Sequence, residues 1–282
     1  MAMALGCMVF PRPATSPTAS SSPSPSFCPF ASPFPCLFHP SLVPRRFLAA
    51  ACTDTTSHLR HVVDKSLIKV SEAFAEEELW AAACLRVRSF NLFNPSTFSP
   101  SDRMKYLAER EFEALKERIA GKQEGFGRVS CINAALPLSE VQRLSDDLCA
   151  SCKFSDGEEE RVVIGSLDLN RCMRLPDEIP GTKPEGIGAD FARAYLSNVC
   201  VAKELHRHGL GYMIVNRAKA VAQEWGITDL YVHVAVDNTP AKNLYMKSGF
   251  VHESDEPAWQ ARFLDRPRRI LLWMGLPATY EL

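Results

Sequence analysis

The segment that most constrains this 282-residue chain runs from residue 195 to residue 250. An apolar strand pattern at 195–201 leads into a glycine-containing turn at 206–211, and an amphipathic helix pattern then ends at Gly226. A second apolar strand pattern follows at 230–236. A strand, a helix and a strand in this order predict two neighbouring parallel strands joined by a right-handed crossover, with the helix packed on the sheet.

The turn between the first strand and the helix predicts an anion site. Gly209 and Gly211 allow the backbone to approach a ligand closely, and the helix start presents unpaired N–H groups and a partial positive charge. The pyrophosphate of a nucleotide cofactor is the expected ligand. A Gly-x-Gly turn alone also occurs in dinucleotide folds and in plain tight turns, so further residues are needed.

Those residues follow the turn. Asn238, Ala241, Tyr245 and the pair Gly249 and Phe250 occur at a spacing that resembles the acetyl-CoA-dependent GNAT superfamily of N-acetyltransferases. The resemblance extends over about residues 68–276 and is most specific across 195–250. It implies an α/β GNAT fold, in which a mixed central sheet of about six to seven strands has splayed central parallel strands and about four flanking helices.

The turn departs from the family pattern at two positions. His206 stands where the family has Arg or Gln, and Lys203 where Pro is common. Main-chain amides hold the phosphates in this family, so binding need not be lost, and Arg207 is a candidate for the missing cation. The resemblance implies acetyl-CoA-binding positions at Val199, Cys200, Val201, His206, Arg207, His208, Gly209, Leu210, Gly211, Asn238 and Tyr245.

The resemblance also implies catalytic residues. It assigns Tyr245 to hydrogen-bond or protonate the departing CoA sulfur, and a phenol of pKa about 10 is a feasible donor to a thiolate. Tyr195 and His233 correspond to a pair that orders a water acting as base in N-terminal acetyltransferases of the superfamily.

Structural alternatives exist for these positions. They are a core tyrosine at 245, a hydrogen-bonded structural histidine at 233 and a helix N-cap at Asn238. Glu204 and Asp237 are weaker candidates for a base and are better explained as turn residues.

The rest of the chain supplies the flanking elements. Strand patterns occur at 66–70, 126–136, 161–169 and 269–276, and helix patterns at 71–89, with Ser71 as its cap, and at 101–121. A polar stretch separates the strands at 126–136 and 161–169. The segment 171–190 is an insertion, either a surface loop or a cover for the active site. In the loop at 252–268, Trp259 and Phe263 are candidates to floor a peptide groove, or to pack under the loop.

The N-terminal segment has a different composition from the rest. Residues 1–52 contain no Asp or Glu, only Arg12, Arg45 and Arg46 as strong cations, and long Ser and Pro tracts. This is typical of a disordered plastid transit peptide, although a tail without targeting function has the same composition. The expected organisation is a transit peptide at 1–52, a linker at 53–65 and a GNAT domain at 66–282, located in the chloroplast stroma.

Composition argues against several other classes of function. The formal net charge is −1, so the basic stripe expected of a nucleic-acid-binding protein is missing, and no apolar run is long enough to cross a bilayer. The ten cysteines are irregularly spaced, and Cys149 and Cys152 form a lone CxxC without a second pair, so free thiols and no metal are expected. The chain is expected to be a monomer.

The leading hypothesis is a plastid protein N-acetyltransferase acting by direct attack in a ternary complex. An α-amine of pKa about 8 needs less help from a base than a lysine of pKa about 10.4, which favours protein N-termini with lysine as a secondary substrate. Two alternatives remain, an acetyltransferase for small amines such as an arylalkylamine or a polyamine, and a module that binds acetyl-CoA without turnover.

Overall fold

The computed structural model describes residues 64–277, except 92, 94–98, 123–125, 143, 158, 173 and 177–191. The expected transit peptide, most of the linker and most of the insertion at 171–190 therefore lie outside the described residues. The elements within them are β1 (Lys69–Glu72), α1 (Glu76–Phe90), α2 (Pro100–Ile119), β2 (Phe126–Pro137), α3 (Leu138–Val141), α4 (Asp146–Ser151), β3 (Lys153–Asp156), β4 (Glu159–Cys172), β5 (Arg193–Val201), α5 (Leu210–Glu224), β6 (Asp229–Ala235), α6 (Thr239–Lys247), β7 (Val251–Asp255), α7 (Ala258–Phe263) and β8 (Arg269–Gly275).

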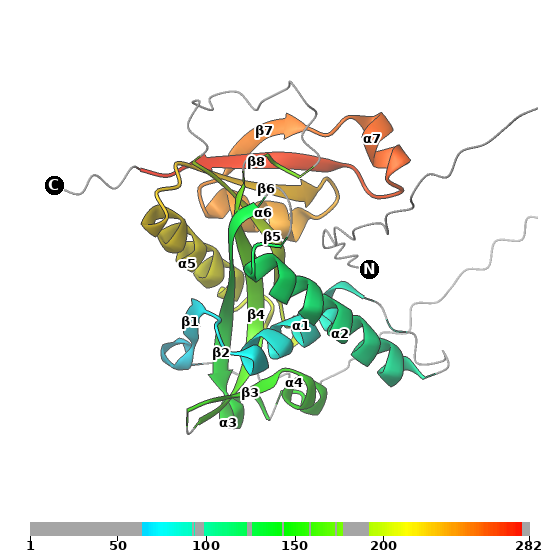
Figure 1. Cartoon of the computed structure of the whole chain (residues 1–282), viewed down its shortest axis with the longest axis vertical. Coiled ribbons are helices and arrows are strands. Elements are labelled where there is room, and N and C mark those ends of the chain that lie inside the picture. The colour runs from blue at the N-terminus through cyan, green and yellow to red at the C-terminus, as the bar shows by residue number, and fades with distance from the viewer. Residues whose placement is uncertain are drawn as a thin grey trace, which may run out of the picture. The chain divides into compact units, whose positions relative to one another are not determined.

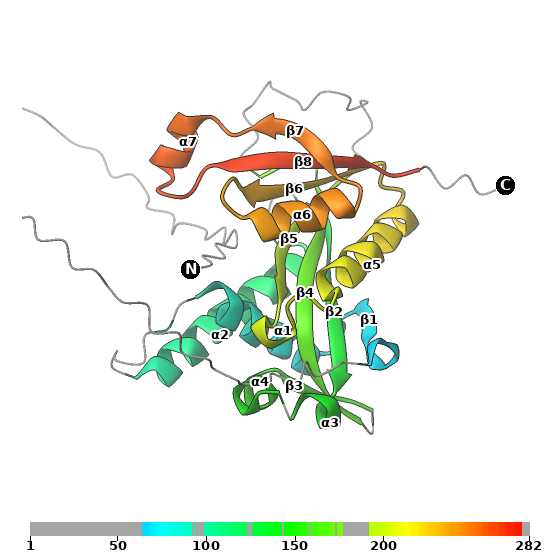
Figure 2. The ribbon, with the colours of Figure 1, turned by 180° about the vertical axis from the view of Figure 1, so that it is seen from behind.

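A single mixed sheet organises these elements. Its order is β1-β2-β4-β5-β6-β8-β7, and β3 pairs with β4, which makes eight strands in the described part of the chain. The pair β5 and β6 is parallel, and the other pairs are antiparallel. Helices α1 and α2 lie on one face of the sheet, and α5 and α6 on the other (Figures 1 and 2). We call these the α1 face and the α5 face.

This architecture confirms the predicted α/β fold with a mixed sheet. The four expected helices correspond to α1, α2, α5 and α6. Because the polar stretch after β2 forms α3, α4 and β3, the sheet has one strand more than the upper end of the predicted range. Likewise, α7 forms inside the loop expected between β7 and β8.

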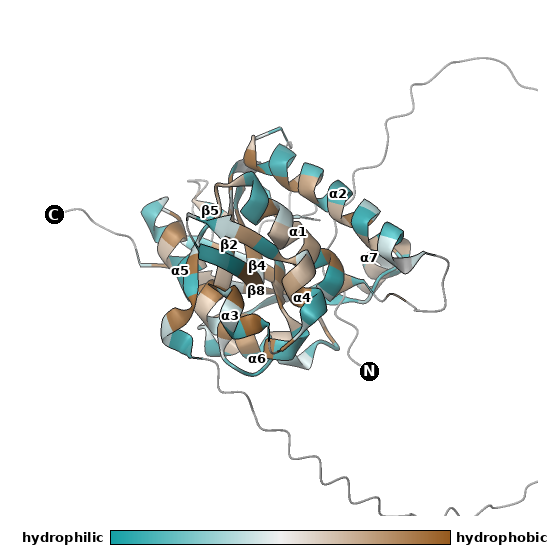
Figure 3. Cartoon of the chain, turned by 90° about the horizontal axis from the view of Figure 1, so that it is seen from below, coloured by the Kyte–Doolittle hydropathy of each residue, from teal (hydrophilic) through white to brown (hydrophobic). Residues whose placement is uncertain are grey.

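Helix α5 covers the central strands as its sequence pattern predicts. Ile214, Ala218 and Val221 are fully buried, and Gly226 has the positive φ of 70° that ends the segment. Figure 3 shows hydrophilic and hydrophobic residues alternating along α2 and α5. The amphipathic faces thus hold the helices against the two faces of the sheet.

The start of α1 differs from the prediction. Ser71 pairs with Asn133 as part of β1, so it does not cap a helix. The N-cap is Ala75, without a side-chain cap hydrogen bond, and Glu76, Glu77 and Glu78 occupy the first turn, where carboxylates favour a helix start. The local sequence does not indicate that β1 pairs with β2. This pairing moves the start of the helix by five residues, from 71 to 76.

Candidate functional site

Strands β5 and β6 separate from each other along their length. Their parallel pairing covers Arg193 to Leu196 against Asp229 to Val232, and within the described strand pairs it stops there. On its other side, β5 stays paired with β4 as far as Val201. The two strands therefore open towards their C-terminal ends, as the predicted splayed strands require.

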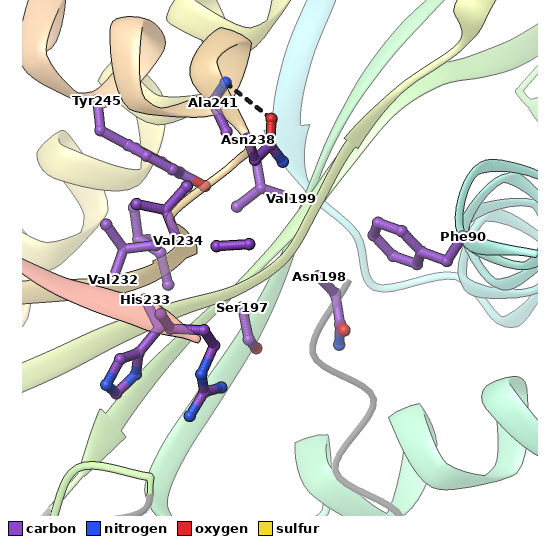
Figure 4. A pocket seen from close by; sticks show the side chains of 13 residues that line it. Phe90, Ser197, Asn198, Val199, Val232, His233, Val234, Asn238, Ala241 and Tyr245 are labelled. Carbon is purple, nitrogen blue, oxygen red and sulfur yellow. Dashed lines mark hydrogen bonds between the residues drawn. The ribbon is translucent and has the colours of Figure 1, made fainter. Parts of the chain in front are cut away.

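A pocket lies in this opening (Figure 4). It lies between the ends of β5 and β6, the start of α6 and the last residue of α1. Its lining residues are Phe90, Leu196, Ser197, Asn198, Val199, Val232, His233, Val234, Ala235, Asn238, Ala241, Tyr245 and Arg269. Four of the predicted residues therefore meet here, namely Val199, His233, Asn238 and Tyr245.

Tyr195 and His233 form a pair on the α1 face. The Tyr195 hydroxyl lies 3.1 Å from Nδ1 of His233, and the ring centroids are 5.7 Å apart. Tyr195 is 3% exposed in a small cluster with Tyr231 and Leu271, whereas His233 is half-buried. Because side chains alternate along β6, His233 lies on the face opposite the buried Leu230, Val232 and Val234, as the sequence predicted.

Tyr245 approaches the same pocket from the α5 face. It belongs to the main hydrophobic core, together with Val232 and Val234, and its ring meets that of Phe250 edge-on at 5.6 Å. The Phe250 N–H donates to the Tyr245 carbonyl at 3.0 Å, and Gly249 adopts a φ of 95° that permits this helix end. In Figure 4 the hydroxyl end of Tyr245 points into the pocket.

The two glycines of the turn have different roles. Gly209 is the N-cap of α5 with a φ of 86°, and no side chain caps the first turn. The first N–H groups of α5 therefore lack partners within the helix, which is the arrangement expected of an anion site. A Cβ on Gly211 would lie 3.0 Å from the side chain of Leu244, so this glycine allows α5 and α6 to pack closely. Leu210 itself is buried.

The histidines of the turn are engaged locally. His206 Nε2 lies 3.0 Å from the Val201 carbonyl oxygen, and His208 Nδ1 lies 3.0 Å from the carbonyl oxygen of His206. Arg207 is exposed and has a φ of 69°. A cation that sequence reasoning missed is also close: Lys65 Nζ would lie 3.7 Å from a Cβ on Gly209. The segment before β1 lies beside this turn only in the folded protein, so no local sequence pattern predicts the contact.

Asn238 both caps α6 and lines the pocket. Its Oδ1 accepts a hydrogen bond from the Ala241 N–H at 3.2 Å. The N-cap interpretation is thereby confirmed. Val199 and Val201 are half-buried at the opening, while Cys200 is 6% exposed.

Glu204, a weaker candidate for a base, is bound in an ion pair. Arg88 Nη2 and Nη1 donate to its two carboxylate oxygens at 2.7 and 3.0 Å, and Arg88 Nε donates to Asp147. Burial raises the pKa of Glu204, but the bonds from Arg88 outweigh it and hold the pKa below its ordinary value. This pair attaches α1 to the turn, so Glu204 is a structural residue.

The cysteines of the described residues are buried free thiols. Burial raises the pKa of Cys84 and Cys200 to about 11 and that of Cys131 and Cys152 to about 12. Because thiolates are the reactive and metal-binding form, the CxxC pair is poorly suited to redox or metal chemistry. The described side chains also form no cluster of three or more potential metal ligands. Among the described helices, none has the length and apolar composition of a membrane span.

Trp259 and Phe263 lie on α7 and are 58% and 80% exposed. The interpretation that they pack under a loop is therefore wrong. Phe90, Ser197, Asn198 and Arg269 line the pocket without having been singled out from the sequence. No local pattern marks them, because they reach the pocket through strand pairing and through the end of α1.

Sequence comparisons agree with this geometry. The sequence profile of the Acetyltransferase (GNAT) family matches residues 134–250. The chain is 68% identical over 217 residues to GCN5-related N-acetyltransferase 7, chloroplastic, of Arabidopsis thaliana, an alignment that covers 77% of this chain and 79% of that protein. It is 30% identical over 187 residues to GCN5-related N-acetyltransferase 6, chloroplastic, of the same plant, covering 64% and 60%.

The chain therefore belongs to the GNAT family of acetyltransferases. The predicted plastid location is also confirmed, because the 68% identical relative is a chloroplast protein. The transit peptide and its cleavage site stay predictions.

Solved structures show lower similarity. The ribosomal-protein-S18-alanine N-acetyltransferase of Escherichia coli aligns with a TM-score of 0.42 and 14% identity, covering 76% of this chain and 97% of that one. The paia N-acetyltransferase of Thermoplasma acidophilum, in complex with coenzyme A, aligns with a TM-score of 0.43 and 13% identity, covering 74% and 98%. The family assignment depends on the sequence matches.

The site fits the cofactor of the family. Between Ser197 and Val201, β5 is paired with β4 on one side only in the described strand pairs, which leaves an edge for an extended cofactor arm. The start of α5, with Gly209 as its N-cap, lies just beyond this edge and is suited to a pyrophosphate. Residues 197–201, the turn and Asn238 are therefore the candidates to hold acetyl-CoA.

Proposed function

We propose that this acetyltransferase uses acetyl-CoA to acetylate the α-amines of plastid protein N-termini, and secondarily lysine ε-amines, by direct attack in a ternary complex. The observation that carries the proposal is the Tyr195–His233 pair, which lies on the α1 face of the opening, opposite Tyr245 on the α5 face. One face thus offers a proton acceptor for an amine, and the other a proton donor for a leaving group.

When bound, acetyl-CoA supplies an activated acetyl thioester and a thiolate as leaving group. The pocket-facing hydroxyl of Tyr245 is placed to donate a hydrogen bond or a proton to the departing sulfur. Its ring is held by Phe250 and by the core, so the hydroxyl needs little reorganisation. The backbone at Gly209 and the amide of Asn238 are the proposed contacts that keep the cofactor in place.

Tyr195 and His233 are the proposed base. At 3.1 Å, the phenol can donate its proton to Nδ1 of His233 while its oxygen accepts a proton from the incoming amine, directly or through an ordered water. The imidazole then holds that proton as the amine attacks. This arrangement explains how a site without a strong carboxylate base can deprotonate an amine.

The lining of the pocket favours an α-amine. Among the described lining residues there is no Asp or Glu, and the one lining cation, Arg269, is paired with the buried carboxylate of Glu256 at 3.6 Å. A polyamine or a protonated lysine therefore finds no carboxylate partner there. An α-amine of pKa about 8 is substantially neutral at mildly alkaline pH and needs none. We propose that the acceptors are plastid polypeptides, and that the enzyme acts as a monomer without nucleic acid or membrane partners.

The test is to express residues 53–282 in bacteria and to compare acetylated N-termini and lysines by mass spectrometry with those of cells expressing the Tyr245→Phe variant. New acetylated N-termini that depend on Tyr245 are expected, with fewer new acetyl-lysines. An unchanged acetylated proteome would contradict the proposal. In the same preparation, CoA release with spermidine or an arylalkylamine but not with peptides would favour a small-amine enzyme. Calorimetric CoA binding without CoA release on any amine would indicate a binding module.

A further inference from the structure

An irregularity in β5 lies at the start of the opening that holds the pocket. Between the pairs Ser166 with Cys200 and Asp168 with Ser197, β4 has one intervening residue and β5 has two. This extra residue is a β-bulge, which bends a strand and increases its local twist. Asn198 sits in it with a φ of 54°, a left-handed conformation that Asn tolerates better than most residues.

A buried charged cluster holds the bulge from the α1 face. Asn198 Nδ2 donates to Asp168 Oδ2 at 2.8 Å, and the other carboxylate oxygen of Asp168 accepts from Arg86 Nη2 at 2.6 Å. Arg118 lies 3.3 Å from Asp168, and Glu111 bonds both arginines at 3.0 and 3.1 Å. The Arg86 and Asp168 side chains are completely buried.

The contacts of Asp168 favour the ionised form of its carboxyl group. Burial raises the pKa of Asp168, but the charges of Arg86 and Arg118 and the hydrogen bonds from Arg86 and Asn198 outweigh it, so the pKa stays below its ordinary value. Two arginines face two carboxylates, and the cluster is neutral as a whole. Such buried ion pairs add little net stability compared with apolar packing, so the arrangement calls for another explanation.

The position of the cluster suggests that explanation. It joins α1, α2 and β4 to the one residue of β5 that has left-handed geometry, and α1 ends four residues after Arg86 at Phe90, which lines the pocket. The neighbouring Arg88 ties the same end of α1 to the turn through Glu204. The bulge and the rim of the pocket are therefore fixed to one common support.

We propose that Asp168 is a positioning residue. It holds Asn198 in the left-handed bulge and thereby sets the separation of β5 from β6 at which cofactor and amine meet. This inference rests on the proposed acetyl transfer in the same pocket, but it concerns cofactor binding whatever the acceptor is. Neither Arg86 nor Asp168 lines the pocket, so Asp168 acts through Asn198, and Arg86 acts through Asp168.

The test separates the backbone geometry of the bulge from its anchor, the hydrogen bond of Asn198 to Asp168. Asn198→Gly keeps the left-handed backbone and loses the bond to Asp168, whereas Asn198→Ala loses both. Asn133→Ala is the matched control, because Asn133 is 1% exposed, donates to Glu78 at 3.1 Å and does not line the pocket. The measurements are CoA affinity by calorimetry, the melting temperature, and the kcat and KM values.

We expect CoA affinity to fall about tenfold in Asn198→Ala and by less in Asn198→Gly, since alanine disfavours the left-handed conformation that asparagine and glycine tolerate. Asn133→Ala should lose melting temperature without losing CoA affinity. If the variants at 198 lose melting temperature while CoA affinity and both kinetic constants match Asn133→Ala, the cluster is only structural and the inference fails.

Should Asn198→Ala not fold, the comparison of Asn198→Gly with Asn133→Ala decides. Wild-type CoA affinity in Asn198→Gly would overturn the role of the anchor, and weaker affinity would support it. Because CoA binding is measured directly, a wrong acceptor class leaves this result unchanged. The failure of the proposed function and the failure of the positioning role are thus distinguishable.

Discussion

A tyrosine lies on each face of the sheet beside the opening between β5 and β6, although only Tyr245 lines the pocket, and the two tyrosines differ in their partners. Tyr195, on the α1 face, is hydrogen-bonded to the imidazole of His233, while Tyr245, on the α5 face, packs edge-on against Phe250. The first phenol is therefore coupled to an imidazole nitrogen that can exchange a proton with it, and the second is packed in an apolar cluster. In the proposed mechanism, proton removal and proton donation therefore take place on opposite faces of the sheet.

The largest expected effect is on the α5 face. Tyr245→Phe removes only the hydroxyl, so the packing against Phe250 is kept. We expect kcat to fall about 10²–10³-fold with little change in the KM for acetyl-CoA, because the donor acts on the leaving group. Steady-state kinetics on a peptide substrate measure this, with Tyr106→Phe on the exposed surface of α2 as the matched control. Equal losses in turnover and cofactor affinity would indicate a structural tyrosine.

The next effect is on the α1 face. His233→Ala and Tyr195→Phe should each lower kcat/KM about 10–10²-fold at neutral pH, less than Tyr245→Phe because an α-amine of pKa about 8 is already partly neutral. The double variant should be little worse than either single one, since the two residues act as a unit.

The loss of kcat/KM in His233→Ala and in Tyr195→Phe should become smaller as the pH rises towards 9, where about nine-tenths of the α-amines are neutral without a base. His252→Ala, at an exposed histidine of β7, is the control. A pH-independent deficit, or additive losses in the double variant, would refute the proposed base.

A smaller effect is expected where α1 meets the turn. Glu204→Gln breaks the pair with Arg88, whose side chain is 10% exposed, and should cost about 1–3 kcal/mol of stability. The folded-state pKa of Glu204 lies below its ordinary value of 4.5, so the pair stabilises the protein above that pH and loses its contribution as the pH falls through the folded-state pKa.

Chemical denaturation across this pH range should therefore show a gap between wild type and Glu204→Gln at neutral pH that closes on acidification. A gap that persists well below pH 4.5 would contradict the assignment.

The smallest effect is expected from Lys65. Its ammonium group beside Gly209 is exposed, so Lys65→Ala should raise the KM for acetyl-CoA only about two- to fivefold. The difference should vanish at high salt, because exposed charges are screened. Lys153→Ala, at an exposed lysine paired with Glu160, provides the comparison. If both lysine variants behave alike, Arg207 becomes the better candidate for the cation of the turn.

The part of the site that could be predicted from the sequence is the part built from local signals. Gly209 and Gly249 mark left-handed positions, and the strand patterns around Tyr195 and His233 place both residues correctly on the sheet. These signals depend on backbone conformation and on alternation within a few residues. The same holds for the N-cap at Asn238.

The features of the site that the sequence did not predict depend on contacts between segments that are distant along the chain. The bulge at Asn198 exists only because β4 and β5 slip by one residue, and its anchor unites Arg86, Glu111 and Asp168 from three separate elements. Lys65 reaches the turn across the fold in the same way. The strand β3 and the start of α1 were misjudged for the same reason, since both depend on a partner strand.

The burial of the thiols has a practical consequence. Disulfide exchange and oxidation by peroxide both act on the thiolate form of cysteine. With pKa values of about 11 to 12, Cys84, Cys131, Cys152 and Cys200 present almost no such target inside the folded domain. Thiol-directed reagents should accordingly leave these four side chains unmodified as long as the domain stays folded.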